Sequence, residues 1–546
     1  MSMYRQILIG GEAGQGIAKA AEILGKAFVR EGFYVFNYRD YPSLIRGGHN
    51  FNVLAISDEP IMSHEFEGHD IVIALNDDTI TKHAAEMKEN AVIFAPNRVN
   101  ADRKISVDTD AIIKELNVPR IMENTILIAA AWKRFGMPFE ALEKTIREEL
   151  KGNEAAVIAA RKGYDAVDAG HAIDAKPMRR ARYFISGSQA VALGAIAAGI
   201  DLYIAYPMTP ATPVLHYLAA LQTKYDYQAI QLENEIAVAN AALGASYAGA
   251  MAMIGTSGGG FALMGEAMSM QGMSEVPLVA YLAMRNAPST GIPTYTGQGD
   301  LKMAVNIGHG EYPKVVVAPG DPKEAFERTI EAFYLAYKYR VLSIIVSDKH
   351  LAESTYTIDA FSPRVKPSRN IVDVVPPDYK SYEITETGVS PRAVPGQADV
   401  PVRATSYEHD EYGYTREEGE WAIKMNDKRF RKVRYISEEI TRLEPVSVYG
   451  EGKNVIVSWG STKGAIVDAI KRLNGWKFVQ VSYIEPFPVE QFKEAIKDAD
   501  RIVLVENDVT GLLGQIIAEK TGIMIDEKVL RYDARPLTPE YIIRRL

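Results

Sequence analysis

The chain has 546 residues, of which 47% are hydrophobic and 24% charged, with a formal net charge of −9 and no cysteine. This balance is typical of a globular protein of about three to four domains, and it excludes collagen-like and disordered chains. The negative charge argues against a nucleic-acid partner. The lack of cysteine excludes disulfides and cysteine-held iron–sulfur clusters, so we expect any redox centre to lie on another chain.

Both apolar stretches that could direct the chain to a membrane are short. Ile7 to Ile9 is too short for the apolar region of a signal peptide, and the stretch from Ala190 to Ile200 ends at Asp201. A bilayer-spanning helix needs about 20 apolar residues. We therefore expect a cytoplasmic protein with no membrane partner.

Short apolar runs alternate with amphipathic segments over most of the chain, which predicts β-α-β units on mostly parallel sheets. The pattern divides the chain into α/β domains over residues 1–175, 182–355 and 451–546. Seven of the 27 prolines fall in the first half of residues 356–450, so this segment is predicted to be an extended linker.

A glycine-rich loop at residues 11–16 follows the first predicted strand and precedes a predicted helix. Gly11, Gly14 and Gly16 would leave backbone N–H groups free to bind a phosphate at the helix N-terminus. Their spacing matches neither the dinucleotide-binding nor the P-loop pattern. A phosphate site and a purely structural tight turn are therefore both open. Residues 46–49 (RGGH) add a cation beside flexible backbone in a predicted loop.

Three segments of the second domain have unusual sequences. The first, YPMTPAT, ends a predicted strand, and its prolines disfavour helix, which places the Thr209 hydroxyl at the carboxyl end of a sheet where α/β proteins bind ligands. In the second, Glu233 and Glu235 precede a helix of small residues, where a carboxylate is also stabilised by the helix dipole alone. The third is the glycine-rich run TSGGGFALMGEAM.

Together these segments resemble one family, the 2-oxoacid:ferredoxin oxidoreductases, which are thiamine diphosphate enzymes. YPMTPAT is similar to the family's Tyr-Pro-Ile-Thr-Pro-Ser/Ala signature, and TSGGGFALMGEAM, MRNAPSTGIPTYTGQGDL and GHGEYPK resemble the segments that follow it, in the same order. GGEAGQG and IRGGHN resemble the family's gamma unit, and WGSTKGAI, IEPFP and ENDVTG resemble its transketolase C-terminal-like domain. The resemblance implies an alpha subunit with a gamma unit fused in front.

The implied fold class is α/β with several parallel-sheet domains. Residues 1–175 would form the gamma-like domain, 182–355 the thiamine-diphosphate-binding domain of the pyrimidine type, and 451–546 the transketolase C-terminal-like domain. The implied activity is the CoA-dependent oxidative decarboxylation of a 2-oxoacid to acyl-CoA and CO2, with electrons passed to ferredoxin.

The resemblance also assigns roles to single residues. Glu235 matches the glutamate that hydrogen-bonds the aminopyrimidine ring of the cofactor, with Glu233 as the second candidate. Arg285 matches the arginine that binds the substrate carboxylate through two parallel hydrogen bonds, although a surface ion pair would also explain it. Thr209 matches a threonine that touches the substrate. His309 is either a loop histidine bonded to backbone or a proton shuttle.

The sequence departs from the family pattern at a few positions. Gly259 stands where many relatives have proline, and Tyr295 and Gly297 replace a basic residue and a glutamate. Loss of a cation near Arg285 would weaken the binding of a second carboxylate such as that of 2-oxoglutarate. The choice between pyruvate, 2-oxoglutarate and other oxoacids therefore stays open.

The Gly-Asp-Gly sequence of the family's Mg²⁺-diphosphate site does not occur in the chain. The resemblance therefore implies a beta subunit that carries Mg²⁺, the diphosphate site and an iron–sulfur cluster, with thiamine diphosphate shared between the subunits of a heterodimer or heterotetramer. Ferredoxin would accept the electrons, and coenzyme A, the co-substrate, is a candidate ligand of Gly11, Gly14 and Gly16. The alternative is a non-catalytic nucleotide- or CoA-binding module of a larger complex.

Overall fold

The computed structural model describes residues 3–42, 48–170 and 182–546. The chain divides into two compact units. The first consists of residues 1–185 with two short later segments, 354–360 and 538–544, and the second contains the rest of the chain.

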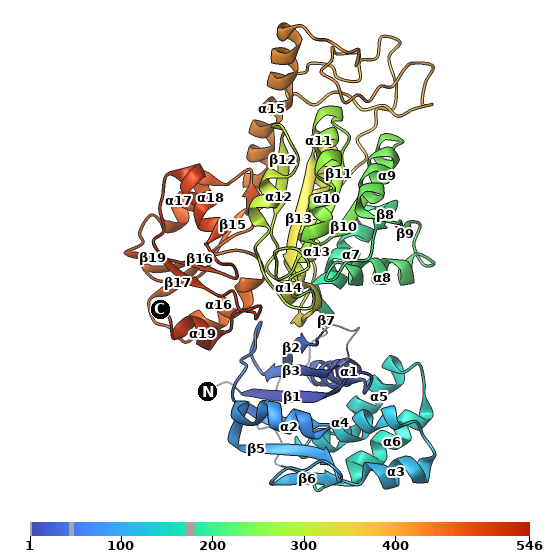
Figure 1. Ribbon diagram of the computed structural model, residues 1–546, viewed down its shortest axis with the longest axis vertical. Helices are drawn as coiled ribbons and strands as arrows, with labels where there is room; N and C mark the ends of the chain where they lie inside the picture. The colour runs from blue at the N-terminus through green and yellow to red at the C-terminus, as the bar shows by residue number, and fades with distance from the viewer. Residues whose placement is uncertain (1–2, 43–47, 171–181) are drawn as a thin grey trace. The chain divides into compact units, whose positions relative to one another are not determined.

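The first unit is built on an eight-stranded sheet with the order β6-β5-β4-β1-β3-β2-β14-β7 (Figure 1). β1 pairs in parallel with β4, as expected, but antiparallel with β3, which also pairs antiparallel with β2. The sheet is therefore mixed. Its strands are β1 (Tyr4–Glu12), β2 (Tyr34–Asp40), β3 (His49–Ser57), β4 (His69–Ala74), β5 (Met87–Pro96), β6 (Lys104–Val107), β7 (Tyr183–Ser186) and β14 (Thr355–Ile358).

Helices cover this sheet through apolar faces. Residues at helical spacing on α1 (Ile17–Arg30), such as Leu24 and Phe28, are fully buried, and the Phe28 ring packs edge-on against Trp132 of α4 (Glu123–Arg134). The other helices of the unit are α2 (Asp77–His83), α3 (Thr109–Leu116), α5 (Phe139–Glu149), α6 (Glu154–Asp165) and α19 (Pro539–Ile543), with short 3₁₀ turns at η1 (Ala84–Glu86) and η2 (Arg120–Met122).

The second unit contains a seven-stranded sheet with the order β18-β12-β13-β11-β10-β8-β9, parallel except for β18 (Figure 1). Its strands are β8 (Leu202–Ala205), β9 (Gln228–Gln231), β10 (Ala252–Thr256), β11 (Leu278–Met284), β12 (Lys314–Val317), β13 (Leu342–Asp348) and β18 (Tyr483–Glu485). β10, β11 and β13 are buried along their length, as expected for strands that are covered on both faces.

The helices around this sheet pack closely because they are rich in small residues. A Cβ atom on Gly194 of α7 (Gly187–Ala198) would come within 2.6 Å of the Phe326 carbonyl oxygen of α13 (Pro322–Tyr339), so only glycine allows this approach. The remaining helices are α8 (Thr212–Leu221), α9 (Glu235–Tyr247), α10 (Gly258–Leu263), α11 (Gly265–Ser274), α12 (Leu301–Asn306) and α14 (Lys349–Glu353).

A five-stranded sheet with the order β15-β17-β16-β19-β20 lies in the same unit, and one continuous apolar core joins it to the larger sheet. Leu278 and Val316 of the larger sheet belong to this core together with Val457 and Leu504. The elements are β15 (Val446–Gly450), β16 (Asn454–Ser458), η3 (Gly460–Thr462), α16 (Lys463–Ile470), β17 (Trp476–Val481), α17 (Val489–Ile496), β19 (Arg501–Glu506), α18 (Leu512–Thr521) and β20 (Glu527–Leu530).

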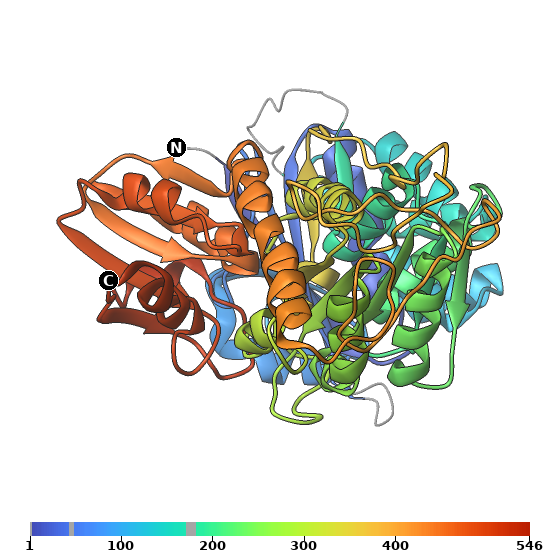
Figure 2. The same ribbon diagram turned by 90° about the horizontal axis from the view of Figure 1, so that it is seen from above.

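Residues 361–418 contain neither helix nor strand, whereas Gly419–Thr441 form α15, a helix of 23 residues inside the segment 356–450. The proline pattern did not reveal this helix. α15 leads from this irregular segment to β15, at the edge of the five-stranded sheet (Figure 1 and Figure 2). The predicted boundary at residue 175 lies outside the described residues, so the domain boundaries stay a prediction.

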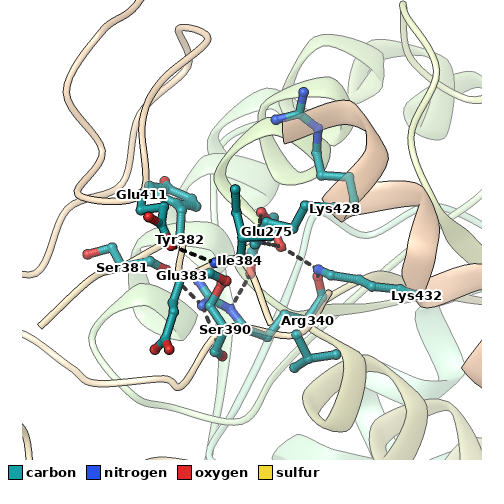
Figure 3. Close-up of polar contacts among 12 residues, drawn as sticks. Glu275, Arg340, Ser381, Tyr382, Glu383, Ile384, Ser390, Glu411, Lys428 and Lys432 are labelled. Atoms are coloured by element: carbon teal, nitrogen blue, oxygen red, sulfur yellow. Dashed lines mark hydrogen bonds and ion pairs between the residues drawn. The ribbon is translucent and has the colours of Figure 1, made fainter. Parts of the chain in front are cut away.

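α15 is anchored by buried charges. Lys428 Nζ lies 2.6 and 2.9 Å from the two carboxylate oxygens of Glu275, and Lys432 donates to the same carboxylate (Figure 3). Arg340 donates to the carbonyl oxygens of Glu275 and Ser381. It thereby links the irregular segment, residues 361–418, to Glu275. Three cations therefore surround one carboxylate in the interior of the protein.

Across the described residues, no helix combines the length and the apolar character that crossing a membrane requires.

Candidate active site

The three unusual segments of the second unit meet at one edge of its large sheet. The loop with Thr209 follows β8, and Arg285 follows β11 directly. The glycine turn, which is the start of α10 at residues 258–260, follows β10. Since β10 lies between β8 and β11 and all three are parallel, their carboxyl ends lie side by side. This is the position at which open α/β sheets bind ligands.

Glu235 is the first residue of α9, and its side chain is buried although it belongs to the helix terminus. The Asn234 side chain caps the helix by accepting a hydrogen bond from Ala237 N at 2.9 Å. Glu235 is only 4% exposed, and its Oε1 atom has no hydrogen-bond partner within the described ranges. Glu233 is exposed. A buried acceptor without a partner costs about 1–3 kcal/mol, so it marks a place where a ligand would bind.

The glycine turn after β10 is shaped around this carboxyl group. A Cβ atom on Gly260 would lie 2.6 Å from Glu235 Oε1 and 2.1 Å from Thr256 Oγ1, so no larger residue fits there. Gly259 instead faces open space, with nothing within 4 Å of such an atom. Replacement of the family's proline at this position therefore removes no packing contact.

Arg285 and the Thr209 loop are joined by a hydrogen bond. Arg285 Nη1 donates to the backbone carbonyl of Thr209 at 2.8 Å. The guanidinium is half-buried, and burial lowers the pKa of Arg285 while the charge of Asp300 acts in the opposite direction. The surface ion pair that could have explained Arg285 does not occur among the described residues. The arginine is thus a cation held at the edge of the site with donors available for an anion.

Asp300 is a site residue that sequence reasoning did not single out. It precedes α12, and burial raises the pKa of its carboxyl group, while Arg285 counteracts this rise. Its Oδ2 atom is buried without a hydrogen-bond partner in the part of the chain that the structure describes. The only sequence signal was its place in the segment GQGDL, which the family resemblance includes.

The predicted loop in the first unit has a well-defined internal structure. Gly14 and Gly16 have φ angles of 95° and 73°, which favour glycine. Gln15 Oε1 accepts from Glu12 N at 2.7 Å, and Asn124 donates to Gln15 O at 2.8 Å. α1 begins here without a side-chain cap, so its first N–H groups suit an anion as well as water.

Packing requires a glycine at position 11, because a Cβ atom there would approach Gln15 Oε1 to 2.5 Å.

Two further sequence candidates are loop residues. Arg46 and Gly47 of the segment RGGH lie outside the described residues. His309 is held through its backbone, since its N–H and carbonyl group both bond to the Ser269 hydroxyl.

The large-sheet site fits half of a thiamine diphosphate pocket. Glu235 Oε1 offers a buried acceptor of the kind that an aminopyrimidine ring requires, beside a turn that admits no side chain at Gly260. Among the residues that the structure describes, no group of three or more His, Asp or Glu side chains could hold a metal ion. The buried Glu235 carboxyl group is therefore the feature of this site that suits the cofactor ring.

Comparison with known proteins shows which family this chain resembles. The family described as "Pyruvate flavodoxin/ferredoxin oxidoreductase, thiamine diP-bdg" matches residues 193–427, and "Pyruvate ferredoxin/flavodoxin oxidoreductase" matches residues 6–170. The 2-oxoacid:ferredoxin oxidoreductase subunit alpha of Saccharolobus solfataricus is 32% identical, over 97% of this chain and 95% of its own length. Subunit alpha of the second such enzyme of Aeropyrum pernix is also 32% identical, with the same coverage.

A solved structure is similar over nearly the whole chain. The 2-oxoglutarate:ferredoxin oxidoreductase from Magnetococcus marinus, with 2-oxoglutarate, coenzyme A and succinyl-CoA bound, has a TM-score of 0.88 at 28% sequence identity. The match covers 99% of this chain and 98% of that one. The α/β fold class predicted from the sequence is confirmed.

Proposed function

The chain belongs to the 2-oxoacid:ferredoxin oxidoreductases as an alpha subunit, and we propose that Glu235, Thr209 and Arg285 form its share of the active site. The enzyme oxidatively decarboxylates a 2-oxoacid. The observation that carries the proposal is the buried, unpartnered Oε1 atom of Glu235 at the carboxyl edge of the thiamine diphosphate-binding domain.

Thiamine diphosphate, when bound, would supply a carbon nucleophile for the ketone of the 2-oxoacid. Glu235 would hold the aminopyrimidine ring nitrogen with its Oε1 atom and share a proton with it. No side chain fits at Gly260 beside the Glu235 carboxyl group, whereas the neighbouring Gly259 faces open space. The site thus binds and orients the ring, and Glu235 keeps a proton at a defined atom.

Arg285 would bind the carboxylate of the 2-oxoacid through two parallel hydrogen bonds. Its bond to the Thr209 carbonyl fixes the guanidinium relative to the threonine, whose hydroxyl would contact the substrate. Both residues therefore orient the oxoacid for attack at its ketone carbon.

A partner subunit completes the enzyme in this proposal. The chain has no cysteine to hold an iron–sulfur cluster and no Gly-Asp-Gly sequence for the diphosphate end. We therefore assign the cluster, Mg²⁺ and the diphosphate site to a beta subunit, and we propose ferredoxin as the electron acceptor and a cytoplasmic location. The glycine loop with Gly11, Gly14 and Gly16 stays a candidate contact for coenzyme A, a ligand of the Magnetococcus marinus structure.

A non-catalytic nucleotide- or CoA-binding module would leave the buried Glu235 carboxyl without a function. The test is the reduction of a viologen dye by the chain purified with its native partner. Pyruvate, 2-oxoglutarate and branched-chain or aryl oxoacids are compared, each with coenzyme A. At least one oxoacid should reduce the dye in a CoA-dependent reaction that also yields CO2. A thiamine-loaded complex that oxidises no 2-oxoacid would contradict the proposed function.

A further inference from the structure

Three polar side-chain atoms around the glycine turn are buried and have no hydrogen-bond partner within residues 182–546. They are Glu235 Oε1, Ser257 Oγ and Asp300 Oδ2. The cofactor role proposed for Glu235 accounts for the first. Nothing in the proposed function accounts for the carboxyl group of Asp300.

Asp300 and Glu235 contact the same turn at its two ends. A Cβ atom on Gly258 would lie 2.2 Å from Asp300 Oδ2, and one on Gly260 would lie 2.6 Å from Glu235 Oε1. Asp300 immediately precedes α12 but does not cap it with its side chain. The carboxyl group of Asp300 is thus placed against the site and not used to stabilise its own helix.

The charges near Asp300 are few. Arg285, at the end of β11, lowers the pKa of Asp300 against the rise that burial causes. Among the described residues, no ion pair or hydrogen bond joins Arg285 to Asp300, because Arg285 bonds the Thr209 carbonyl and Asp300 Oδ2 has no partner. Glu235 contacts the same turn, and Lys302 of α12 is turned away to bond Gln515 at 3.1 Å.

We propose, on the basis of the function above, that Asp300 is a further substrate-site residue and carries a proton while the 2-oxoacid is bound. A substrate carboxylate on Arg285 places a second negative charge beside a carboxyl group that is already buried. Two carboxylates that share one cation in a desolvated site do not both stay ionised. The carboxyl group of a 2-oxoacid is a stronger acid than an aspartic acid side chain, so the proton resides on Asp300.

The proton comes from the solvent, and no other bond forms or breaks in this step. Substrate binding is therefore coupled to the uptake of one proton per site. The protonated carboxyl group becomes a hydrogen-bond donor in the site, through an oxygen that has no partner among the described residues.

Calorimetry on the assembled, thiamine-loaded complex counts this proton. Oxamate, an unreactive analogue of pyruvate, is bound at about pH 8 in two buffers of different ionisation enthalpy, and N-oxalylglycine replaces it if the enzyme prefers 2-oxoglutarate. About one proton should be taken up per site. The wild-type complex alone decides this point: binding without proton uptake at this pH would overturn the proposal.

Steady-state kinetics separates the role of Asp300 from a merely structural one. The apparent KM for the oxoacid should rise about tenfold per pH unit above the pKa of Asp300, and kcat should not follow it. In the variant Asp300→Asn, KM should be nearly independent of pH over the same range. The matched control is Asp373→Asn, at an exposed position of the irregular segment, which should keep the wild-type profile.

The two proposals fail in different ways. A complex that oxidises a 2-oxoacid but shows the same pH dependence of KM with and without Asp300 contradicts the role of Asp300 only. A loaded complex that oxidises no 2-oxoacid contradicts the proposed function.

Discussion

Two glutamates stand two positions apart at the start of α9, and burial alone distinguishes them. Glu233 is exposed, whereas Glu235 is 4% exposed and turns its Oε1 atom into the site. Both could have been cofactor acids by sequence. The difference follows from the Asn234 cap, which fixes where the helix begins and therefore on which side each carboxyl group lies.

The variant Glu235→Gln should assemble normally, because the amide has nearly the same shape as the carboxyl group. Turnover of the complex should fall about 100-fold or more, since the amide cannot share a proton with the cofactor ring. The measurement is oxoacid-dependent dye reduction at saturating thiamine diphosphate. The matched control is Glu233→Gln, which should stay close to the wild type; wild-type turnover in Glu235→Gln would disprove the assignment.

The substitution Arg285→Lys tests the substrate carboxylate site. A lysine cannot both bond the Thr209 carbonyl and present two parallel donors to a carboxylate. Loss of one charge-assisted hydrogen bond costs about 1.5–3 kcal/mol, so the apparent KM for the oxoacid should rise roughly 10- to 100-fold. Arg434→Lys on the exposed face of α15 serves as the control. An unchanged KM for every oxoacid would place the carboxylate site elsewhere.

Sequence motifs singled out three of the proposed site residues but not Asp300, although Asp300 lies in the same quoted segment as Arg285. Thr209, Glu235 and Arg285 each lie in a segment with its own signature. The role of Asp300 depends on its contact with Gly258, 42 positions earlier, and on burial by the rest of the fold. Such long-range packing leaves no local pattern in the sequence.

At the scale of elements, the strands and glycine turns follow the sequence pattern closely, while the anchoring of α15 does not. Apolar runs predicted β16 and β19 because each is short, β-branched and followed by a turn. α15 carries Lys428 and Lys432 on its buried side, which a periodic apolar pattern cannot reveal. β18 was also unpredictable, because it leaves its neighbours in sequence to pair with β12.

The buried Lys428 of α15 should make the stability of the protein depend on pH. Burial, with the charges of Lys432 and Arg340, lowers the pKa of Lys428 to about 7, although Glu275 opposes the shift. The unfolded chain keeps this proton up to a pKa near 10.5. Between these values the unfolded state binds more protons, so the free energy of unfolding rises with pH, by at most about 1.4 kcal/mol per unit.

The variant Lys428→Met removes this titration and keeps most of the side-chain volume. The melting temperature of the wild type relative to the variant should therefore increase from about pH 7 to pH 9. Lys424→Met, at an exposed position on the same helix, should leave the wild-type pH dependence unchanged. A difference between wild type and Lys428→Met that does not change with pH would show that Lys428 is charged throughout.

At the scale of the whole molecule, two parts of the second unit that are far apart in sequence are hydrogen-bonded next to the proposed active site. Gln298 N donates to Asn507 O at 2.9 Å, and Asn507 N donates to Gln298 Oε1 at 3.0 Å. The segment after β19 thus holds the loop that carries Asp300. In the proposed function, the chain supplies the part of the cofactor site that binds the ring, and a partner subunit supplies the diphosphate end.

The most direct test of this division compares the chain purified alone with the chain co-expressed with a smaller, cysteine-containing partner that has the Gly-Asp-Gly sequence. Oxoacid-dependent dye reduction is measured together with bound iron and thiamine diphosphate. The chain alone should contain no stoichiometric iron, bind thiamine diphosphate poorly and oxidise no 2-oxoacid. The complex should contain iron, bind thiamine diphosphate and oxidise a 2-oxoacid. An active, metal-free assembly of this chain alone would contradict the account.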